Sequence, residues 1–299
     1  MNPVSRFLVA AATACTAAPL AAQAPAQPSA QIPALRLRDG SVRFLVLGDA
    51  GTGDRPQYEV ARQIVNYRRR FPFTFSILLG DNIYGKERPQ DFAKKFERPY
   101  KELLDAGVEF HAALGNHDDP NQRYYKPYNL GGKRYRTFKK DNVRFFILDS
   151  NYLDPEQVRW LTSELESSGS DWKVAYFHHP LYTTARRGPE VELRAILEPL
   201  FVKHGVDVVF TGHEHIYERF KPQNGIYHFT VGGAAKLRRG DTRRAPIIDA
   251  RFDRDRSFLL VEIAGDSLFF QAISRTGRVV DQGALARRNT GQPIPAPRP

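Results

Sequence analysis

The sequence predicts an α/β domain with mixed β-sheets, and two patterns along the chain support this prediction. Between residues 42 and 215, short apolar runs rich in β-branched residues alternate with segments of helical character. Such alternation is typical of strands joined by helices, and strand-rich sequence follows residue 215. The 299 residues include 41% hydrophobic and 12% aromatic side chains. This composition is enough to fill a substantial core, so the chain as a whole is expected to fold.

The alternating part contains five buried strands that each end at a cluster of polar residues. The expected strands are 42–51, 73–82, 108–118, 172–180 and 206–215. The expected helices are 56–70, 89–106, 155–168 and 189–204. Residues 134–150 predict a hairpin with Asp141-Asn142 at its turn. Further along, SFLLVEIAG (257–265) and SLFFQAIS (267–274) are expected to be strands.

The first 24 residues have the layout of a secretory signal peptide. Arg6 precedes a compact apolar run, and small residues follow it, with cleavage expected after Ala22 or Ala24. The run is too short to span a bilayer, so no stable membrane insertion is expected. Cys15, the only cysteine, lies in this segment, and its removal would exclude thiol chemistry from the mature protein. The chain is therefore expected to be exported, periplasmic or secreted; the alternative is a disordered leader with no export role.

The remaining chain is expected to be a single domain between two segments of low complexity. Residues 25–35, rich in Pro, Ala and Gln, are expected to form a linker, and 287–299 a disordered tail. Residues 36–286 between them contain no internal repeat and no second linker.

The chain is basic, with 44 Lys and Arg against 33 Asp and Glu and a formal net charge of +11. Part of the excess lies in short clusters, namely Arg68 to Arg70, Arg186 and Arg187, and Arg238, Arg239, Arg243 and Arg244. The clusters are either solvated surface or the source of a field that draws anionic substrates toward a site. Charge alone does not separate these two interpretations.

Five of the strand ends supply side chains that bind metals. They are Asp49 in GDAG, Asp81 and Tyr84 in GDNIY, Asn116 and His117 in GNHD, His178 in FHHP, and His213 and His215 in GHEH. Ligands in open α/β sheets bind at the carboxyl ends of strands. Carboxylate, phenolate, amide oxygen and imidazole together suit a hard or borderline cation such as iron, zinc or manganese. Residues i and i+2 of an extended segment point to the same side, so His213 and His215 are able to face one site.

Each motif taken alone has an ordinary structural explanation. A strand-end Asp is often a helix cap or a turn residue, and a Tyr such as Tyr84 is often a packed aromatic with a bonded hydroxyl. The combination is more specific, because five of the eight histidines fall inside these turns.

As an ordered set, GDxG, GDxxY, GNHD, HxP and GHxH resemble the signature of the calcineurin-like metallophosphoesterases. The Tyr of GDNIY, together with Ala50-Gly51 after Asp49, is similar to the purple (tartrate-resistant-type) acid phosphatase branch, and the match spans roughly residues 43–220. The resemblance implies an α/β four-layer sandwich of two mixed β-sheets flanked by helices.

The resemblance also implies two metal positions that share one carboxylate. The first would hold Fe(III) with Asp49, Asp81, Tyr84 and His215. The second would hold Zn(II), Mn(II) or Fe(II) with Asp81, Asn116, His178 and His213. A phenolate bound to Fe(III) predicts a purple or pink colour.

The fourth motif departs from the family pattern VxxH, because Val174 lies one position early. We assign His178 rather than His179 as the ligand, since the family ligand precedes x-Pro and Pro180 fits that spacing. His179 is then expected to face the substrate or support a ligand. His117 is the first candidate for protonating the leaving group, and His179 is the second.

The implied activity is that of an acid phosphatase, in which a metal-bound hydroxide attacks the phosphorus of a small phosphomonoester. One alternative is a phosphodiesterase or nuclease with the same metal pair, in which case nucleic acid would be a substrate only. The other is an exported phosphate- or polyanion-binding protein with a remnant site. That reading predicts missing ligands, and none is missing from the motifs.

Overall fold

The computed structural model describes residues 35–169 and 171–287. The predicted signal peptide lies outside the described residues, as do the predicted linker apart from Leu35 and the predicted tail apart from Arg287. Arg287 directly follows the last strand, and its backbone N–H donates to the carbonyl of Asp266 at 2.8 Å. No helix in these two ranges is both long enough and apolar enough to cross a bilayer.

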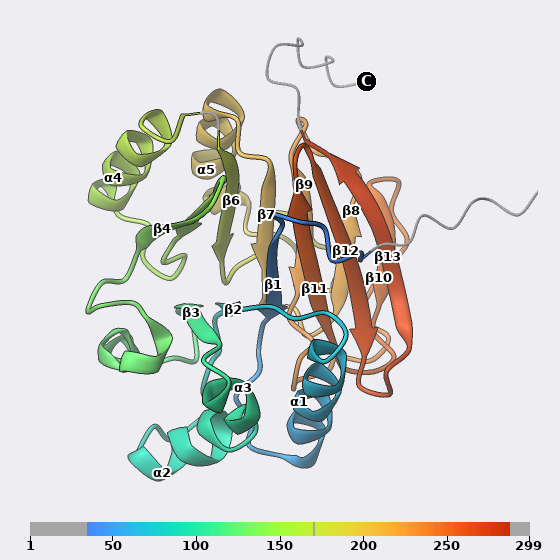
Figure 1. Ribbon diagram of the computed structural model, residues 1–299. Coiled ribbons are helices and arrows are strands. Elements are labelled where there is room, and N and C mark those ends of the chain that lie inside the picture. The colour runs from blue at the N-terminus through green and yellow to red at the C-terminus, as the bar shows by residue number, and fades with distance from the viewer. Residues whose placement is uncertain (1–34, 170, 288–299) are drawn as a thin grey trace, which may run out of the picture. The chain divides into compact units, whose positions relative to one another are not determined.

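The first sheet has six strands in the order β13-β12-β11-β1-β2-β3 (Figure 1). Their bounds are β1 Val42–Leu47, β2 Phe75–Leu79, β3 Glu109–Ala113, β11 Ser257–Ala264, β12 Ser267–Ser274 and β13 Val279–Ala286. Strands β1, β2 and β3 run parallel, and β11, β12 and β13 extend the sheet antiparallel from β1. The sheet is therefore mixed, with its parallel part drawn from the alternating half of the sequence.

The second sheet has seven strands in the order β10-β8-β9-β7-β6-β5-β4. Their bounds are β4 Arg136–Lys140, β5 Val143–Ile147, β6 Trp172–Phe177, β7 Val208–Thr211, β8 Tyr217–Phe220, β9 Tyr227–Val231 and β10 Ile248–Phe252. Strands β5, β6, β7 and β9 are parallel, and the strands at either edge are antiparallel. The parallel strands thus form one half of the first sheet and the centre of the second.

The two sheets pack face to face through aromatic side chains. Phe44 of β1 stacks on Phe75 of β2, with ring centroids 5.3 Å apart, and meets Phe145 of β5 edge-on at 5.3 Å. Strand β5 alternates in its packing, since Phe145 lies in this inter-sheet core while Phe146 belongs to a second core. An alternation with period two is what a strand buried on both faces produces.

Helices cover the outer faces of both sheets. On the second sheet, α4 (Pro155–Glu166) and α5 (Val191–His204) enclose the second core, where Phe201 packs near Phe177 (Figure 1). On the first, α1 (Arg55–Arg68) packs beside β11 through Tyr67 and Phe258. The described residues therefore form the four-layer sandwich of two mixed sheets and flanking helices that the sequence predicted.

Most predicted elements are confirmed, including the hairpin, whose turn residue Asp141 has φ 49°. The single helix expected over 89–106 is wrong in detail. That stretch is divided into α2 (Pro89–Phe92), a π-helical turn (Ala93–Glu97) and α3 (Lys101–Asp105). A bond from α1 contributes to the break, because the side-chain amide of Gln57 donates to the Lys95 carbonyl at 2.5 Å. Two short 3₁₀ turns, Pro120–Tyr124 and Lys126–Tyr128, follow β3.

Candidate metal centre

The seven predicted metal ligands follow the carboxyl ends of parallel strands from both sheets. Asp49, Asp81 and Asn116 come after β1, β2 and β3, Tyr84 lies three residues beyond Asp81, His178 directly follows β6, and His213 and His215 follow β7. Their ligand atoms lie within a few ångströms of one another, in two groups. The structure thus brings all seven together at the carboxyl ends of the parallel strands of the two sheets.

The first group contains Asp49, Tyr84 and His215. The Tyr84 hydroxyl donates to Asp49 Oδ1 at 2.8 Å and lies 3.2 Å from His215 Nε2. His215 Nε2 is also 3.2 Å from Asp49 Oδ1. Asp81 belongs to the same group, because Asp49, Asp81 and His215 each offer a ligand atom within 4.8 Å of the others.

The second group contains Asn116, His178 and His213. Asn116 Oδ1 lies 3.1 Å from His178 Nε2 and 2.9 Å from His213 Nδ1. The two imidazole nitrogens are 3.1 Å apart. Asp81 Oδ1 lies 3.4 Å from His178 Nε2, so Asp81 lies close to both groups, as a bridging ligand would.

The proton positions in the second group indicate that it fits a cation. His178 Nδ1 donates to the Leu79 carbonyl at 2.9 Å, so the neutral ring has its lone pair on Nε2. That lone pair faces Asn116 Oδ1 and Asp81 Oδ1, which are also acceptors. Acceptors at such distances repel one another unless a cation lies between them. Imidazole, carboxylate and amide oxygen are suitable donors for zinc, iron or manganese.

Burial keeps the imidazoles of the centre neutral, which is the form that binds metal. It lowers the pKa of His178 well below its usual range, the pKa of His213 to about 2 and the pKa of His215 to about 4. Burial and then the charge of Asp81 raise the pKa of Asp49. Two buried carboxylates next to each other are costly without a compensating positive charge, so this group also fits a cation.

The backbone of the strand-end turns holds the ligands in an unusual conformation. Asp49, Asp81 and His213 have φ values of 57°, 52° and 67°, in the left-handed region that non-glycine residues seldom adopt. Backbone N–H groups then bind the carboxylates: His213 donates to Asp49 Oδ2 and His117 to Asp81 Oδ1, both at 2.9 Å. Conformations of this kind are often found at functional sites.

The close approach of the turns explains glycine at two positions. A Cβ atom on Gly115 would lie 2.2 Å from the backbone N and Oδ1 of Asp81. A Cβ atom on Gly212 would lie 2.7 Å from Asp49 Oδ2 and 3.0 Å from the Leu79 carbonyl. Neither site accepts a larger residue without moving a candidate ligand.

The two candidate proton donors lie beside the centre. His117 is exposed, and its ring centroid is 5.0 Å from that of Tyr84. His179 is partly buried, its Nδ1 lies 2.9 Å from Ser150 Oγ, and its ring centroid is 4.6 Å from that of His213. His179 also groups with His178 and His213 as a potential ligand.

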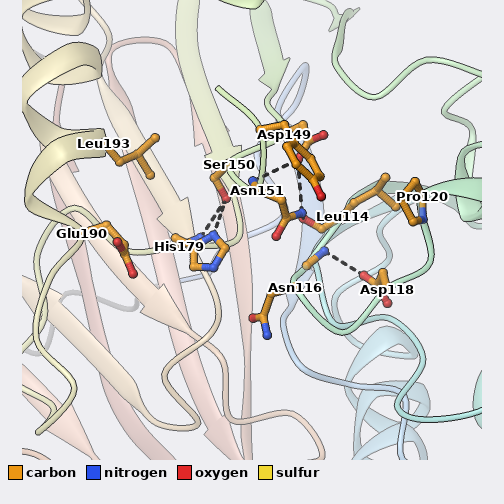
Figure 2. A pocket seen from close by; sticks show the side chains of 12 residues that line it. Leu114, Asn116, Asp118, Pro120, Asp149, Ser150, Asn151, His179, Glu190 and Leu193 are labelled. Carbon is orange, nitrogen blue, oxygen red and sulfur yellow. Dashed lines mark hydrogen bonds between the residues drawn. The ribbon is translucent and has the colours of Figure 1, made fainter. Parts of the chain in front are cut away.

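A cleft of about 620 Å³ opens beside the second group, next to Asn116 and His179 (Figure 2). Its other polar lining residues are Asp118, Asp149, Ser150, Asn151, Tyr152 and Glu190. In Figure 2, Ser150 and His179 are joined by dashed lines, and Glu190 lies near His179 at the start of α5. The cleft is large enough for a small ligand.

Sequence reasoning missed two residues of this site, Ser150 and Glu214, and did not separate a third, Arg187, from its neighbour. Ser150 holds His179, and its signal was a polar strand end after β5 that resembles the other five. Glu214, between the two histidines of GHEH, is buried and paired with Arg238 at 3.1 Å. Arg187 contacts His213 from the loop after β6, and no local pattern distinguishes it from Arg186.

A protein-family model described as calcineurin-like phosphoesterase matches residues 42–217, more than half of the chain. Among curated proteins, purple acid phosphatase 17 of Arabidopsis thaliana is 26% identical over 68% of this chain and 71% of its own length. Human tartrate-resistant acid phosphatase type 5 is 25% identical over 84% of this chain and 94% of its own length. These relatives agree with the resemblance that the motifs indicated.

Solved structures show the same fold. GAP50 of Plasmodium, described as the anchor in the inner membrane complex, has a TM-score of 0.72 at 19% identity and covers 83% of this chain and 90% of its own. The purple acid phosphatase PPD1 of yellow lupin has a TM-score of 0.65 at 19% identity, covering 84% of this chain and 55% of its own. By its sequence match, the chain belongs to the calcineurin-like phosphoesterase family and is a metal-dependent phosphoric ester hydrolase.

Proposed function

We propose that this protein is an acid phosphatase that hydrolyses small phosphomonoesters at a pair of metal ions. The observation that carries the proposal is the convergence of lone pairs from Asn116, His178 and Asp81, which calls for a cation, beside the group formed by Asp49, Tyr84 and His215. Two adjacent ligand groups that share Asp81 are the arrangement that two ions need.

The donor chemistry suggests a different ion for each group. Asp49, Asp81, Tyr84 and His215 would hold Fe(III), since carboxylates and a phenolate suit a hard, highly charged ion. Asp81, Asn116, His178 and His213, with two imidazoles, would hold Zn(II), Mn(II) or Fe(II). When bound, the ions would act as Lewis acids toward phosphate and lower the pKa of water. Burial raises the pKa of Tyr84, so ionisation of this hydroxyl would require the cation.

The chain's own side chains would manage the proton and the leaving group. His117 is the first candidate to protonate the leaving oxygen, because it is exposed beside the first group and its backbone is held by Asp81. His179 is the second, because it lines the cleft and is held by Ser150. A leaving group of small-molecule size would occupy the cleft.

We further propose that the chain is exported, to the periplasm or the medium. The support is the order of Arg6, an apolar run and small residues at the start of the sequence. Intact mass of the protein recovered outside the cytoplasm would give the mature N-terminus, expected after Ala22 or Ala24. A protein that retains Met1 would contradict export by cleavage.

The reaction is tested by comparing an aryl phosphate monoester with the matching diester across pH 4 to 9, using one metal-replete preparation and a metal-only blank. Faster monoester turnover with an acidic optimum is expected. Preferred diester turnover would contradict the phosphomonoesterase proposal and favour a phosphodiesterase or nuclease. No turnover above the blank would favour a phosphate- or polyanion-binding protein.

A further inference from the structure

Arg187 reaches the candidate metal centre from the loop between β6 and α5. Its Nη1 contacts His213 Nε2 and lies 3.5 Å from His213 Nδ1. Its side chain is 44% exposed, so the guanidinium lies at the centre and is also reachable from solvent. Among the residues that the structure describes, no other arginine side chain contacts a predicted ligand in this way.

We propose that Arg187 binds the phosphoryl oxygens of the substrate at the metal centre, an inference that rests on the proposed phosphatase function. Arginine suits this role because its planar guanidinium offers donors in a fork that matches phosphate, and it stays charged at every working pH. It would therefore hold the phosphate while the cleft holds the leaving group.

The two nitrogens of His213 explain why the guanidinium is available for a substrate. Nδ1 faces Asn116 Oδ1 and His178 Nε2, as expected for a metal ligand, and Arg187 lies on the Nε2 side. When Nδ1 coordinates a metal, the neutral ring carries its proton on Nε2. A guanidinium is a donor only, so it cannot bond to that N–H and requires another acceptor. A phosphoryl oxygen at the centre would be such an acceptor.

Glu214 keeps the guanidinium nearby without neutralising it. This carboxylate is buried, with Oε1 3.9 Å from Arg187 Nε and Oε2 3.1 Å from Arg238 Nη1. One carboxylate therefore faces two guanidinium groups. Lys236 adds a third positive charge, with its Nζ 4.4 Å from the Tyr84 ring centroid. Three cationic side chains, Arg187, Arg238 and Lys236, therefore lie beside the centre, where they attract a phosphate dianion.

The lining of the cleft differs from this side of the centre in its charged side chains. None of the described residues that line the cleft is Lys or Arg, and Glu190 contributes a carboxylate. Two further carboxyl groups line it, but Asp149 is paired with Arg134 at 2.9 Å and burial raises the pKa of Asp118 to about 8. The lining of the cleft therefore offers a phosphate dianion no cationic partner, whereas Arg187 does. The two environments together orient a phosphomonoester, with its phosphoryl group toward Arg187 and its uncharged part toward the cleft.

Arg186 supplies a matched control. It is the neighbouring residue and has the same charge, but it is 73% exposed and its Nε lies 3.7 Å from Asp241 Oδ1. Replacing Arg186 removes one positive charge from the same loop without removing the group that faces His213.

The test measures the dissociation constant of inorganic phosphate by calorimetry with metal-replete full-length protein, and the metal content of each sample. Arg187→Ala is expected to weaken phosphate binding about tenfold or more, as for the loss of a charged hydrogen bond, with both metals retained. Arg187→Lys is expected to recover part of the loss, and Arg186→Ala to stay within about twofold of the wild type.

Unchanged phosphate affinity in Arg187→Ala would overturn the proposal. Loss of metal in that variant would also overturn it, because Arg187 would then support His213 rather than bind substrate.

Measurements of phosphate binding and of turnover distinguish a failure of the inference about Arg187 from a failure of the proposed function. If the wild type binds phosphate but hydrolyses no aryl phosphate, the proposed function is wrong while the role of Arg187 is still decided by the binding data. If the wild type hydrolyses the ester and Arg187→Ala matches it in phosphate affinity and KM, the inference about Arg187 is wrong and the function stands.

Discussion

The histidines of this centre differ in their contacts, and these differences match the separate roles proposed for them. His178 is fully buried and has one nitrogen committed to the Leu79 carbonyl, which leaves the other for a metal. His117 contributes its backbone N–H to Asp81 while its side chain is exposed. The proposed ligand and the proposed proton donor therefore differ in burial and in which atoms are already bonded, although both are histidines at a strand end.

A proton donor is identified by its dependence on the leaving group. His117→Ala is expected to slow hydrolysis of an alkyl phosphate by about 10²–10⁴-fold, and to slow 4-nitrophenyl phosphate much less, because nitrophenolate leaves without a proton. Metal content should be unchanged. The slowing of the same two esters by His179→Ala tests the second candidate in the same way. Equal slowing of both esters by His117→Ala would show that His117 is not the donor.

The residues that sequence could not assign depend on contacts between distant segments. The motifs indicated Asp49, Asp81 and the histidines because each is a polar residue directly after an apolar run, which is a local signal. Arg187 and Arg186 are equivalent in sequence, and only the folding of their loop beside β7 places Arg187 against His213. Burial of Glu214 likewise follows from the packing of the turn, and no sequence pattern encodes it.

At the scale of secondary structure, short strand-end turns from two sheets position the whole centre. Gly212 lets the turn after β7 approach Asp49, and its N–H donates to the His178 carbonyl at 2.9 Å. The turns were predictable because apolar runs and glycines are local features. The break in the helix at Ala93–Glu97 was not, because it involves a bond to Lys95 from Gln57 in another helix.

Gly212→Ala tests the close packing of these turns. The new Cβ would lie 2.7 Å from Asp49 Oδ2, so the variant is expected to lose about 1–3 kcal/mol of unfolding free energy and to bind metal more weakly. Gly233→Ala is the control, because its Cβ would meet its nearest atoms at an ordinary 3.6 Å. Urea unfolding and metal analysis of both variants provide the comparison. Equal stability and metal content in the two would mean that the approach at Gly212 is not tight.

At the scale of the whole molecule, two mixed sheets share one core and carry one site where their parallel strands end. The strand–helix alternation predicted the α/β class, while the pairing of the sheets was implied only by the family resemblance. The places of β8, β10 and β13 in the two sheets had no sequence signal. Pairing partners are set by long-range contacts, which a single sequence does not specify. The basic clusters also differ in where the fold places them. Arg187 lies at the centre, while Arg69 and Arg70 are exposed beyond α1.

Acid should destabilise the metal-free protein through two buried histidines that are not among the predicted ligands. Burial lowers the pKa of His111 to about 4 and that of His228 to about 3. In the unfolded chain both return to about 6.5, so the unfolded state binds more protons below that pH and stability falls as pH falls. Each is expected to cost about 2–3 kcal/mol between pH 7 and 4.5. Urea unfolding of the wild type and His228→Gln at both pH values checks this, and an equal pH dependence of the two would refute the contribution of His228.

The central claim is that one chain binds two metal ions that share Asp81, and elemental analysis of the purified protein tests it most directly. The wild type, supplied with iron and zinc, should contain two ions per chain, and Asp81→Ala should contain at most one and lose phosphomonoester hydrolysis. Asp105→Ala, at an exposed ion pair in α3, should match the wild type in both. A wild type that saturates below two ions, or an Asp81→Ala variant that keeps both ions and full activity, would contradict the account.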